Sequence, residues 1–503
     1  MSTYRLITAA LLIALLVAPI AAVAPSLVAS AQPTTIKIGA LLPLTGDLQS
    51  YGVRAQAAVQ VAVEDVNAYL EAQNAWFRFE LVVEDTQTKP DIAVQRFGSL
   101  VAQGIKFIVG PMTSAEVKKL KDLADSENVL IISPSSTAIE LKIAGDNVFR
   151  FCPTDDVQSQ AIGALAEDLG LKGVVIINRA DTWGDGLKNA TQEVLEAAGV
   201  EVAAVYSYNP ESPNFPGIAS QANGDIEDLI EKYGQDKVAV VAIGFKEVVE
   251  LFSAAADYDA LASVFWIGSD GTAQLSEFIS DPIASEFSVS TLFINPIFSP
   301  AATEAQEAVR EKVKAMIGEE PDAYSLAAYD AVWAVALALL QTGPIEDPDE
   351  MVASVKELLP EITMSDEFGE VAATGKFPLD EGGDRATADY DWFIVVEVGG
   401  EYKWVKAGVY KGVEDVNEWI EIEGVGKTLP ELFEEKFKPA EETPTETETE
   451  QPAEETPTEE APPAETPEEP EEEGGISTTL IAAIIIIIVV LAAAAYYFFA
   501  RSK

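Results

Sequence analysis

Apolar residues follow two alternating patterns along most of this chain. Short runs rich in Val and Ile, or alternating at period two, predict β-strands, and segments whose apolar residues recur every three to four positions predict helices. Strands are predicted at 35–44, 77–85, 105–110, 129–133, 173–178, 200–208, 237–244 and 263–268. Helices are predicted at 53–70, 92–102, 114–127, 157–169, 186–198, 218–233 and 246–256. This alternation is typical of α/β folds in which parallel sheets are covered by helices on both faces.

The pattern continues beyond residue 300 in a way that favours two lobes. Two more helices are predicted at 301–317 and 323–341, and a hairpin-like strand pair at 391–398 and 402–410. One sheet rarely accounts for about 400 residues, so we expect two α/β lobes joined by a hinge. The expected lobes are about 36–155 with 293–376, and about 156–292 with 377–413.

The N-terminal stretch has the features of a secretory signal peptide. A positive residue, Arg5, precedes a long apolar run, and Ala29 and Ala31 fit a signal-peptidase site. We therefore expect residues 1–31 to be removed and the mature chain to begin at Gln32. An uncleaved N-terminal anchor is the alternative, which two prolines in the stretch disfavour.

The C-terminal end predicts a tether. Residues 476–499 are uncharged and, as a helix, span about 36 Å, enough to cross hydrocarbon about 30 Å thick. Arg501 and Lys503 place the tail on the cytoplasmic side, so the rest of the chain lies outside the cell. Residues 439–475 are rich in Thr, Glu and Pro, without Lys or Arg, and are expected to form an extended linker.

Composition excludes several classes of protein. The formal charge of −51 argues against nucleic acid as a partner, which needs clustered Lys and Arg. The absence of histidine excludes Ser-His-Asp triads and histidine-bound zinc, and the single cysteine, Cys152, cannot form an internal disulfide. No metal site, cofactor site or catalytic carboxylate pair stands out, so we expect a protein that is not an enzyme.

Two predicted strands end in hydroxyl-bearing turns. In "IVGPMTSAEV", Thr113 and Glu116 fit a capping box at the start of a helix. A helix start presents free N–H groups and a positive dipole end, which bind a carboxylate without any lysine. In "SPSSTAIE", Thr137 and Glu140 suggest a second capping box beside Ser135. Taken alone, each is also an ordinary structural device.

Seven segments together resemble one known family. They are "IKIGALLPLTGDLQSYG", "GIKFIVGPMTSAEV", "NVLIISPSSTAIEL", "FRFCPTDDVQSQA", "NRADTWGDGL", "AIGFKEVVEL" and "FWIGSDGTA". In this order they resemble the leucine/isoleucine/valine-binding protein family of ABC-transporter receptors, over about residues 36–410. The resemblance implies a type I periplasmic-binding-protein fold that closes on a small ligand between two lobes. It also implies permease subunits with cytoplasmic ATPases as partners.

The resemblance implies contacts to both charges of an amino acid. The hydroxyls matching Ser114 and Thr137, and the backbone matching Ser135, bind the α-carboxylate in the family. The family's acid that pairs with the α-ammonium matches Asp270, as Asp rather than Glu. An Asp-Gly turn without further function is the plainer alternative for Asp270.

Three aromatic residues are expected at the ligand's side chain. Trp183 and Phe245 stand where the family has tyrosines, which makes the site more apolar, and Tyr51 in the first loop is placed to close its mouth. Plain core packing is the alternative for the first two. The sequence thus predicts a cell-surface receptor of an ABC importer that binds a branched-chain or other apolar amino acid. The alternatives are an amide- or urea-type ligand, and the ectodomain of a sensor that acts through a partner.

Overall fold

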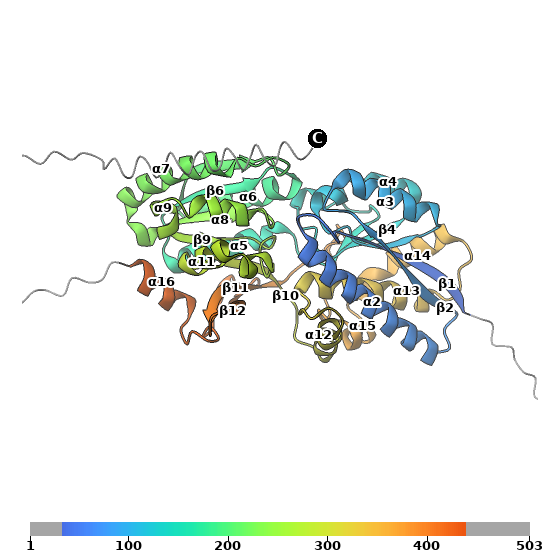
Figure 1. Cartoon of the computed structure of the whole chain (residues 1–503). Helices are drawn as coiled ribbons and strands as arrows, with labels where there is room; N and C mark the ends of the chain where they lie inside the picture. The colour runs from blue at the N-terminus through green and yellow to red at the C-terminus, as the bar shows by residue number, and fades with distance from the viewer. Residues whose placement is uncertain (1–32, 439–503) are drawn as a thin grey trace, which may run out of the picture. The chain divides into compact units, whose positions relative to one another are not determined.

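The computed structural model describes residues 33–438, which form two β-sheets flanked by helices (Figure 1). The predicted fold class is therefore confirmed, down to the pairing of the last two predicted strands as an antiparallel hairpin. The predicted signal peptide (1–31), linker (439–475) and transmembrane segment (476–499) lie outside the described residues.

The first sheet has five parallel strands in the order β2-β1-β3-β4-β5. Alternate side chains of β1 enter different cores: Ile38 and Leu42 pack toward α2 and α13, and Leu41 packs toward α3 and α4. The strands are β1 (Thr34–Leu42), β2 (Phe77–Asp85), β3 (Phe107–Val109), β4 (Leu130–Ser133) and β5 (Val148–Arg150). The accompanying helices are α2 (Gln49–Ala72), α3 (Pro90–Ala102), α4 (Ser114–Glu127), the 3₁₀ turn η1 (Ile139–Leu141), α12 (Glu304–Ile317), α13 (Ala323–Thr342), α14 (Pro348–Ile362) and α15 (Asp366–Val371).

The second sheet has eight strands in the order β13-β12-β11-β10-β9-β8-β6-β7. Strands β6 to β10 run parallel, and β11 to β13 extend the sheet antiparallel on one side. The strands are β6 (Gly173–Arg179), β7 (Glu201–Tyr208), β8 (Val238–Ile243), β9 (Phe265–Ile267), β10 (Ile294–Ser299), β11 (Asp389–Val398), β12 (Glu401–Lys411) and β13 (Val416–Trp419). The helices are α5 (Asp155–Leu169), α6 (Thr182–Ala197), α7 (Phe215–Tyr233), the 3₁₀ turn η2 (Gln235–Lys237), α8 (Val248–Ala255), α9 (Asp259–Ser263), α10 (Glu277–Ser280), α11 (Pro282–Ser290) and α16 (Leu429–Phe437).

Strand β10 differs from the sequence-based expectation. The expected lobe boundary at 293 assigned this segment to the first lobe, whereas it pairs with β9 and β11 in the second sheet. Pro296 interrupts its apolar pattern and removes one backbone donor, which hid the strand. The chain therefore leaves the second sheet after Ser299, and not at the expected boundary before residue 293.

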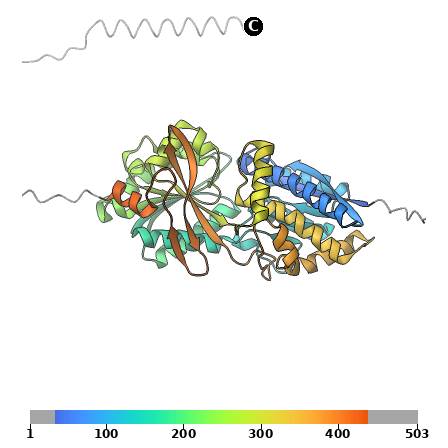
Figure 2. The same cartoon turned by 90° about the horizontal axis from the view of Figure 1, so that it is seen from below.

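The described chain passes between the two sheets three times, after β5, after β10 and before β11 (Figure 2). Two crossings are joined by a buried, bidentate pair: Arg150 Nε lies 2.6 Å from Asp384 Oδ1 and its Nη2 lies 2.5 Å from Oδ2. The backbones of the same segments are also hydrogen-bonded to each other, Arg150 N to Gly383 O and Arg385 N to Arg150 O. Next to them, Cys152 is buried as a free thiol.

Helix α13 is long and apolar enough to span a membrane by composition. Nearly all of it is buried inside the protein, where it packs against α2 and the first sheet. Its role in the fold is that of a core helix. Its first turn, from Ala323, points toward the junction of the two sheets, where Tyr324 reaches the second lobe.

Candidate functional site

The turn after β3 builds the first wall of the site. Gly110 has φ +91°, and a Cβ there would lie 2.1 Å from Leu41 O, so only glycine fits this turn. Thr113 Oγ1 accepts from Glu116 N at 3.2 Å and Glu116 Oε2 accepts from Thr113 N at 3.2 Å, which confirms the first predicted capping box. Described hydrogen bonds leave the N–H groups of Ser114 and Ala115 free to meet an anion.

The turn after β4 is tied to this helix start. Ser135 Oγ donates to Met112 O at 2.8 Å, and Ser114 Oγ accepts from Ala138 N at 3.2 Å. The hydroxyls of Ser114 and Ser136 also lie within hydrogen-bond distance, at 3.2 Å. The two strand ends thus hold each other in place and bring several hydroxyls to one point.

The second predicted capping box is wrong. The segment forms only the 3₁₀ turn η1, whose N-cap is Ala138, without a side-chain cap. Glu140 instead pairs with Lys118 at 2.8 Å. The N–H of Ala138 donates to Ser114, and the turn ends after Leu141. Thr137 is fully buried, and its Oγ1 has no hydrogen-bond partner among the described residues.

A small cavity lies between these turns and the second lobe. Its volume is about 30 Å³, well below the range of about 300–1,000 Å³ typical of ligand sites, so the lobes lie close together around it. Six of the seven predicted site residues line it together, and Thr137 does not. The lining residues are Leu48, Tyr51, Met112, Thr113, Ser114, Ser135, Trp183, Phe245, Asp270, Gly271 and Tyr324.

Asp270 is the charged group of the second wall. It is 3% exposed, Tyr324 donates to its Oδ2 at 2.5 Å, and its backbone N donates to Gln158 Oε1 at 2.9 Å. Its Oδ1 has no partner among the described residues. Burial raises the pKa of this carboxyl to about 6, against the opposing effect of the hydrogen bond from Tyr324.

Stacked side chains form an apolar wall beside Asp270. The rings of Trp183 and Phe245 stack with centroids 4.8 Å apart at 19°, and Arg179 Cζ lies 3.9 Å from the centroid of Phe245. Arg179 is held in turn by Asp181 and Glu247, at 2.6 and 2.7 Å. The two rings thus form a fixed apolar surface without a hydroxyl group.

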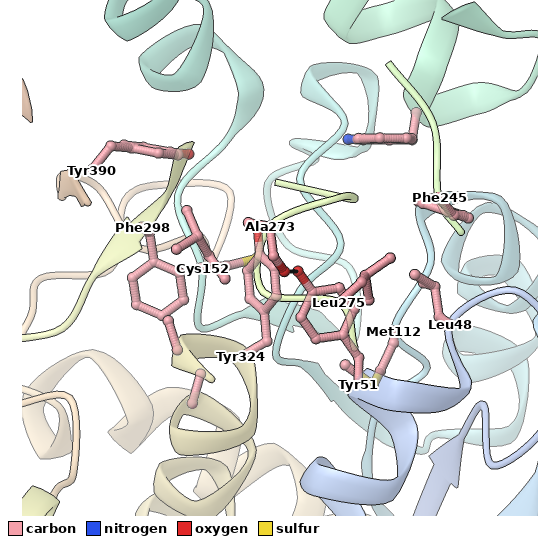
Figure 3. Packing of buried hydrophobic residues seen from close by; sticks show 14 of the residues in the cluster. Leu48, Tyr51, Met112, Cys152, Phe245, Ala273, Leu275, Phe298, Tyr324 and Tyr390 are labelled. Carbon is pink, nitrogen blue, oxygen red and sulfur yellow. Dashed lines mark hydrogen bonds between the residues drawn. The ribbon is translucent and has the colours of Figure 1, made fainter. Parts of the chain in front are cut away.

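A set of contacts that we call the clasp holds the lobes together. It joins Ser50, Tyr51 and Arg54 of α2 to the 270–277 segment of the second lobe. Tyr51 OH donates to Asp270 O at 2.8 Å. It also bonds Ala273 O, and Figure 3 shows this contact. Arg54 Nη2 donates to Gln274 O at 2.9 Å. Ser50 Oγ lies 2.9 Å from both Ser276 Oγ and Glu277 Oε2.

The clasp and cavity describe a closed arrangement. Tyr51 sits in the first turn of α2, not in a loop as expected, so its hydroxyl has a fixed reach. Admission of a ligand to a cavity of this size requires the lobes to separate and the clasp to open.

The sequence missed two polar residues of the site. Tyr324 lies more than 50 positions after Asp270, in the first turn of a helix whose remaining face is plain core. Gln158 lies more than 100 positions before Asp270 on α5.

Comparison with known proteins identifies the family. A family model described as periplasmic binding protein matches residues 35–378. The chain belongs to this family. The resemblance to leucine/isoleucine/valine-binding proteins is confirmed by relatives of that name. Family members are binding receptors that are periplasmic or extracellular and catalyse nothing, so the expectation of a non-enzymatic protein is confirmed as well.

The similarity extends over nearly the whole length of individual relatives. An uncharacterized protein of Methanocaldococcus jannaschii is 35% identical to this binding protein over 398 residues, 77% of this chain and 92% of that protein. A leucine-, isoleucine-, valine-, threonine- and alanine-binding protein of Pseudomonas aeruginosa is 27% identical over 369 residues, 71% of this chain and 90% of that protein. The structure of the substrate-binding protein LivJ of Streptococcus pneumoniae, with isoleucine, matches with a TM-score of 0.58 at 22% identity, covering 74% of this chain and 100% of that one.

Proposed function

We propose that this binding protein is the extracellular receptor of an ABC importer for an apolar amino acid, which it holds in the cleft between its lobes. The observation that carries the proposal is the cavity itself. One side presents the capped start of α4 with Ser114 and Ser135, and the other presents the carboxylate of Asp270. The helix start carries a partial positive charge and the carboxylate a negative one, and they face each other across the cavity. An amino acid carries the complementary carboxylate and ammonium.

The closing motion follows from where these groups lie. The carboxylate of the ligand meets the start of α4 in the first lobe, and the second lobe then brings Asp270, Trp183 and Phe245 onto it. The ligand favours the closed form only through contacts made there, including those of the ligand with Asp270. The clasp residues of α2 complete the closed form.

Calorimetry with leucine, isoleucine, valine and alanine tests the proposal. We expect binding of at least one of them, and a loss of 10-fold or more for Asp270→Asn, since a charge-assisted hydrogen bond contributes about 1.5–3 kcal/mol. Asp257→Asn, at an exposed position of the same lobe, is the matched control and should bind like wild type. Wild-type protein that binds none of the four amino acids would contradict the assignment.

An amide- or urea-type ligand is the second candidate. It is favoured by the tyrosine hydroxyls missing at Trp183 and Phe245 and by Asp270 Oδ1, which could accept an amide N–H as well as an ammonium. Leucinamide, which keeps the ammonium, and 4-methylpentanamide, which lacks it, separate the two. Tight binding of 4-methylpentanamide would favour this second candidate.

The proposal includes the tethering of the receptor to the membrane, which depends on residues beyond the described range. We infer a signal peptide at 1–31, a binding domain at 32–438, a linker at 439–475 and a membrane helix at 476–499. Its lobes would comprise about 36–155 with 293–376 and 156–292 with 377–413, apart from β10. Fractionation of cells tests the anchor: the full chain should sediment with membranes and a chain ending at Lys438 should be released to the medium. Copurification of permease and ATPase subunits with the full chain tests the importer; their absence would leave the sensor alternative.

A further inference from the structure

Four buried side-chain oxygens near the junction of the lobes have no hydrogen-bond partner among the described residues. They are Asp270 Oδ1, Asp155 Oδ2, Thr137 Oγ1 and Tyr390 OH. Their side chains belong to residues that are 0–3% exposed. Buried polar groups are nearly always paired, so four unsatisfied oxygens in one region indicate a place for a group that donates hydrogen bonds.

Asp155 is tied directly to Asp270. It is the first residue of α5, directly after the crossing that follows β5, and its backbone N donates to Thr137 O at 2.9 Å. Gln158 bridges the two acids: its Nε2 donates to Asp155 Oδ1 at 3.3 Å, and its Oε1 accepts from Asp270 N at 2.9 Å. Burial and the neighbouring carboxyl of Asp270 both raise the pKa of Asp155.

No Lys or Arg within residues 33–438 forms an ion pair with either acid. Arg150, whose charge reaches Asp155, is engaged by Asp384 and by the carbonyl groups of Ser136 and Ala138. Asp156, one residue later, is exposed, so solvent screens its charge. The site therefore holds two carboxyls that repel each other when ionised, and the cation that acts on Asp155, Arg150, is already paired with Asp384.

We propose that the cationic group of the ligand is received by two carboxylates, Asp270 from the second lobe and Asp155 from the start of α5. This rests on the function proposed above and sharpens its ligand class. An ammonium donates N–H hydrogen bonds, and the unpartnered oxygens of the two acids offer two acceptors, one from each side, with the Thr137 hydroxyl beside Asp155. A neutral amide cannot compensate two buried negative charges, so the pair selects a cationic ligand against an isosteric neutral one.

Asp155 does not line the cavity in the closed arrangement. It is joined to Asp270 through Gln158, and the charges of both acids act on Tyr390, which Figure 3 shows together with Cys152. The ligand's ammonium would thus enter deeper than its side chain. Its contact with Asp155, which directly follows one of the three crossings, would link ligand binding to the hinge.

Calorimetry on Asp155→Asn with a pair of ligands tests this proposal. The pair is leucine and 4-methylpentanoate, the same molecule without its amino group. We expect a loss of at least 10-fold for leucine and a change of less than threefold for 4-methylpentanoate. Asp156→Asn removes a charge one residue later at an exposed position and should leave both affinities unchanged.

The outcomes separate this proposal from the function on which it rests. Unchanged leucine affinity in Asp155→Asn, or equal losses for both ligands, overturns the role of Asp155 and leaves the amino-acid receptor intact. Wild-type protein that binds no amino acid overturns both. Unfolding of the ligand-free variant gives a second measurement: the neutral, isosteric Asn relieves an uncompensated buried charge, so its midpoint at pH 8 should equal or exceed wild type. A clear fall would show that Asp155 has a structural cation partner instead.

Discussion

The buried acids of the hinge and those of the site are treated in opposite ways by this fold. At the crossings between the sheets, Asp384 faces Arg150 through two hydrogen bonds. On α13, between two of these crossings in sequence order, Asp330 accepts from the backbone of Ala373 and Thr374 at 2.6 and 2.9 Å and from the Thr374 hydroxyl. In the site, Asp270 and Asp155 each keep an oxygen without a partner among the described residues. Acids whose oxygens are all hydrogen-bonded within the protein hold its segments together. Acids with an unpartnered oxygen keep an acceptor for a ligand.

The strongest way to sharpen this contrast is to break the hinge pair. Asp384→Ala leaves the guanidinium of Arg150 buried and unpaired, so we expect the free energy of unfolding to fall by about 3–5 kcal/mol. Chemical denaturation of the purified protein measures it. The matched control is Asp366→Ala, which removes an exposed ion pair with Lys376 and should cost about 0–1 kcal/mol. Equal effects of the two substitutions would contradict the structural role given to the hinge pair.

A second prediction has the opposite sign, because it concerns an acid of the site. Burial raises the pKa of Asp270 to about 6, above the value of about 3.9 expected in the unfolded chain. Its contribution to stability is therefore complete below about pH 4 and is lost as the pH rises through about 6. The loss is up to about 3 kcal/mol. Asp270→Asn should remove this part of the dependence and stabilise the ligand-free protein at pH 7. The part due to Asp330, whose pKa burial raises to about 7, should remain, so the difference between wild type and variant at pH 4 and at pH 7 gives the contribution of Asp270.

Ligand binding should respond to the same titration in the opposite direction. An ammonium prefers the ionised carboxylate, so amino-acid affinity should fall as the pH drops from 7 to 5, as Asp270 becomes protonated. Calorimetry across this range measures the change. A flat profile in wild-type protein would show that Asp270 does not meet a cation, whatever its effect on stability.

The residues of the first wall were predictable because their signals are local. Strand, turn and cap follow one another within ten residues, so the box of Thr113 and Glu116 could be identified from spacing alone. The same spacing failed at Thr137, where only a three-residue 3₁₀ turn forms and Glu140 pairs with Lys118 of another segment instead of capping it. Tyr324 and Gln158 reach Asp270 through contacts that span 54 and 112 positions, and no local pattern marks such pairs.

The smallest effect is expected at the clasp. The clasp acts on the closing of the lobes, whereas the acids of the site act on the charge of the ligand. Ser50→Ala removes the contacts with Ser276 and Glu277 that exist only when the lobes are closed. Each net hydrogen bond contributes about 0.5–1.5 kcal/mol, so closure should weaken and affinity fall about 3- to 10-fold. The loss should be the same for leucine and for 4-methylpentanoate, because the clasp touches neither charge of the ligand. A loss of affinity for leucine alone would mean that α2 acts on the ammonium. Groups that close the lobes could then not be separated from groups that recognise the ligand.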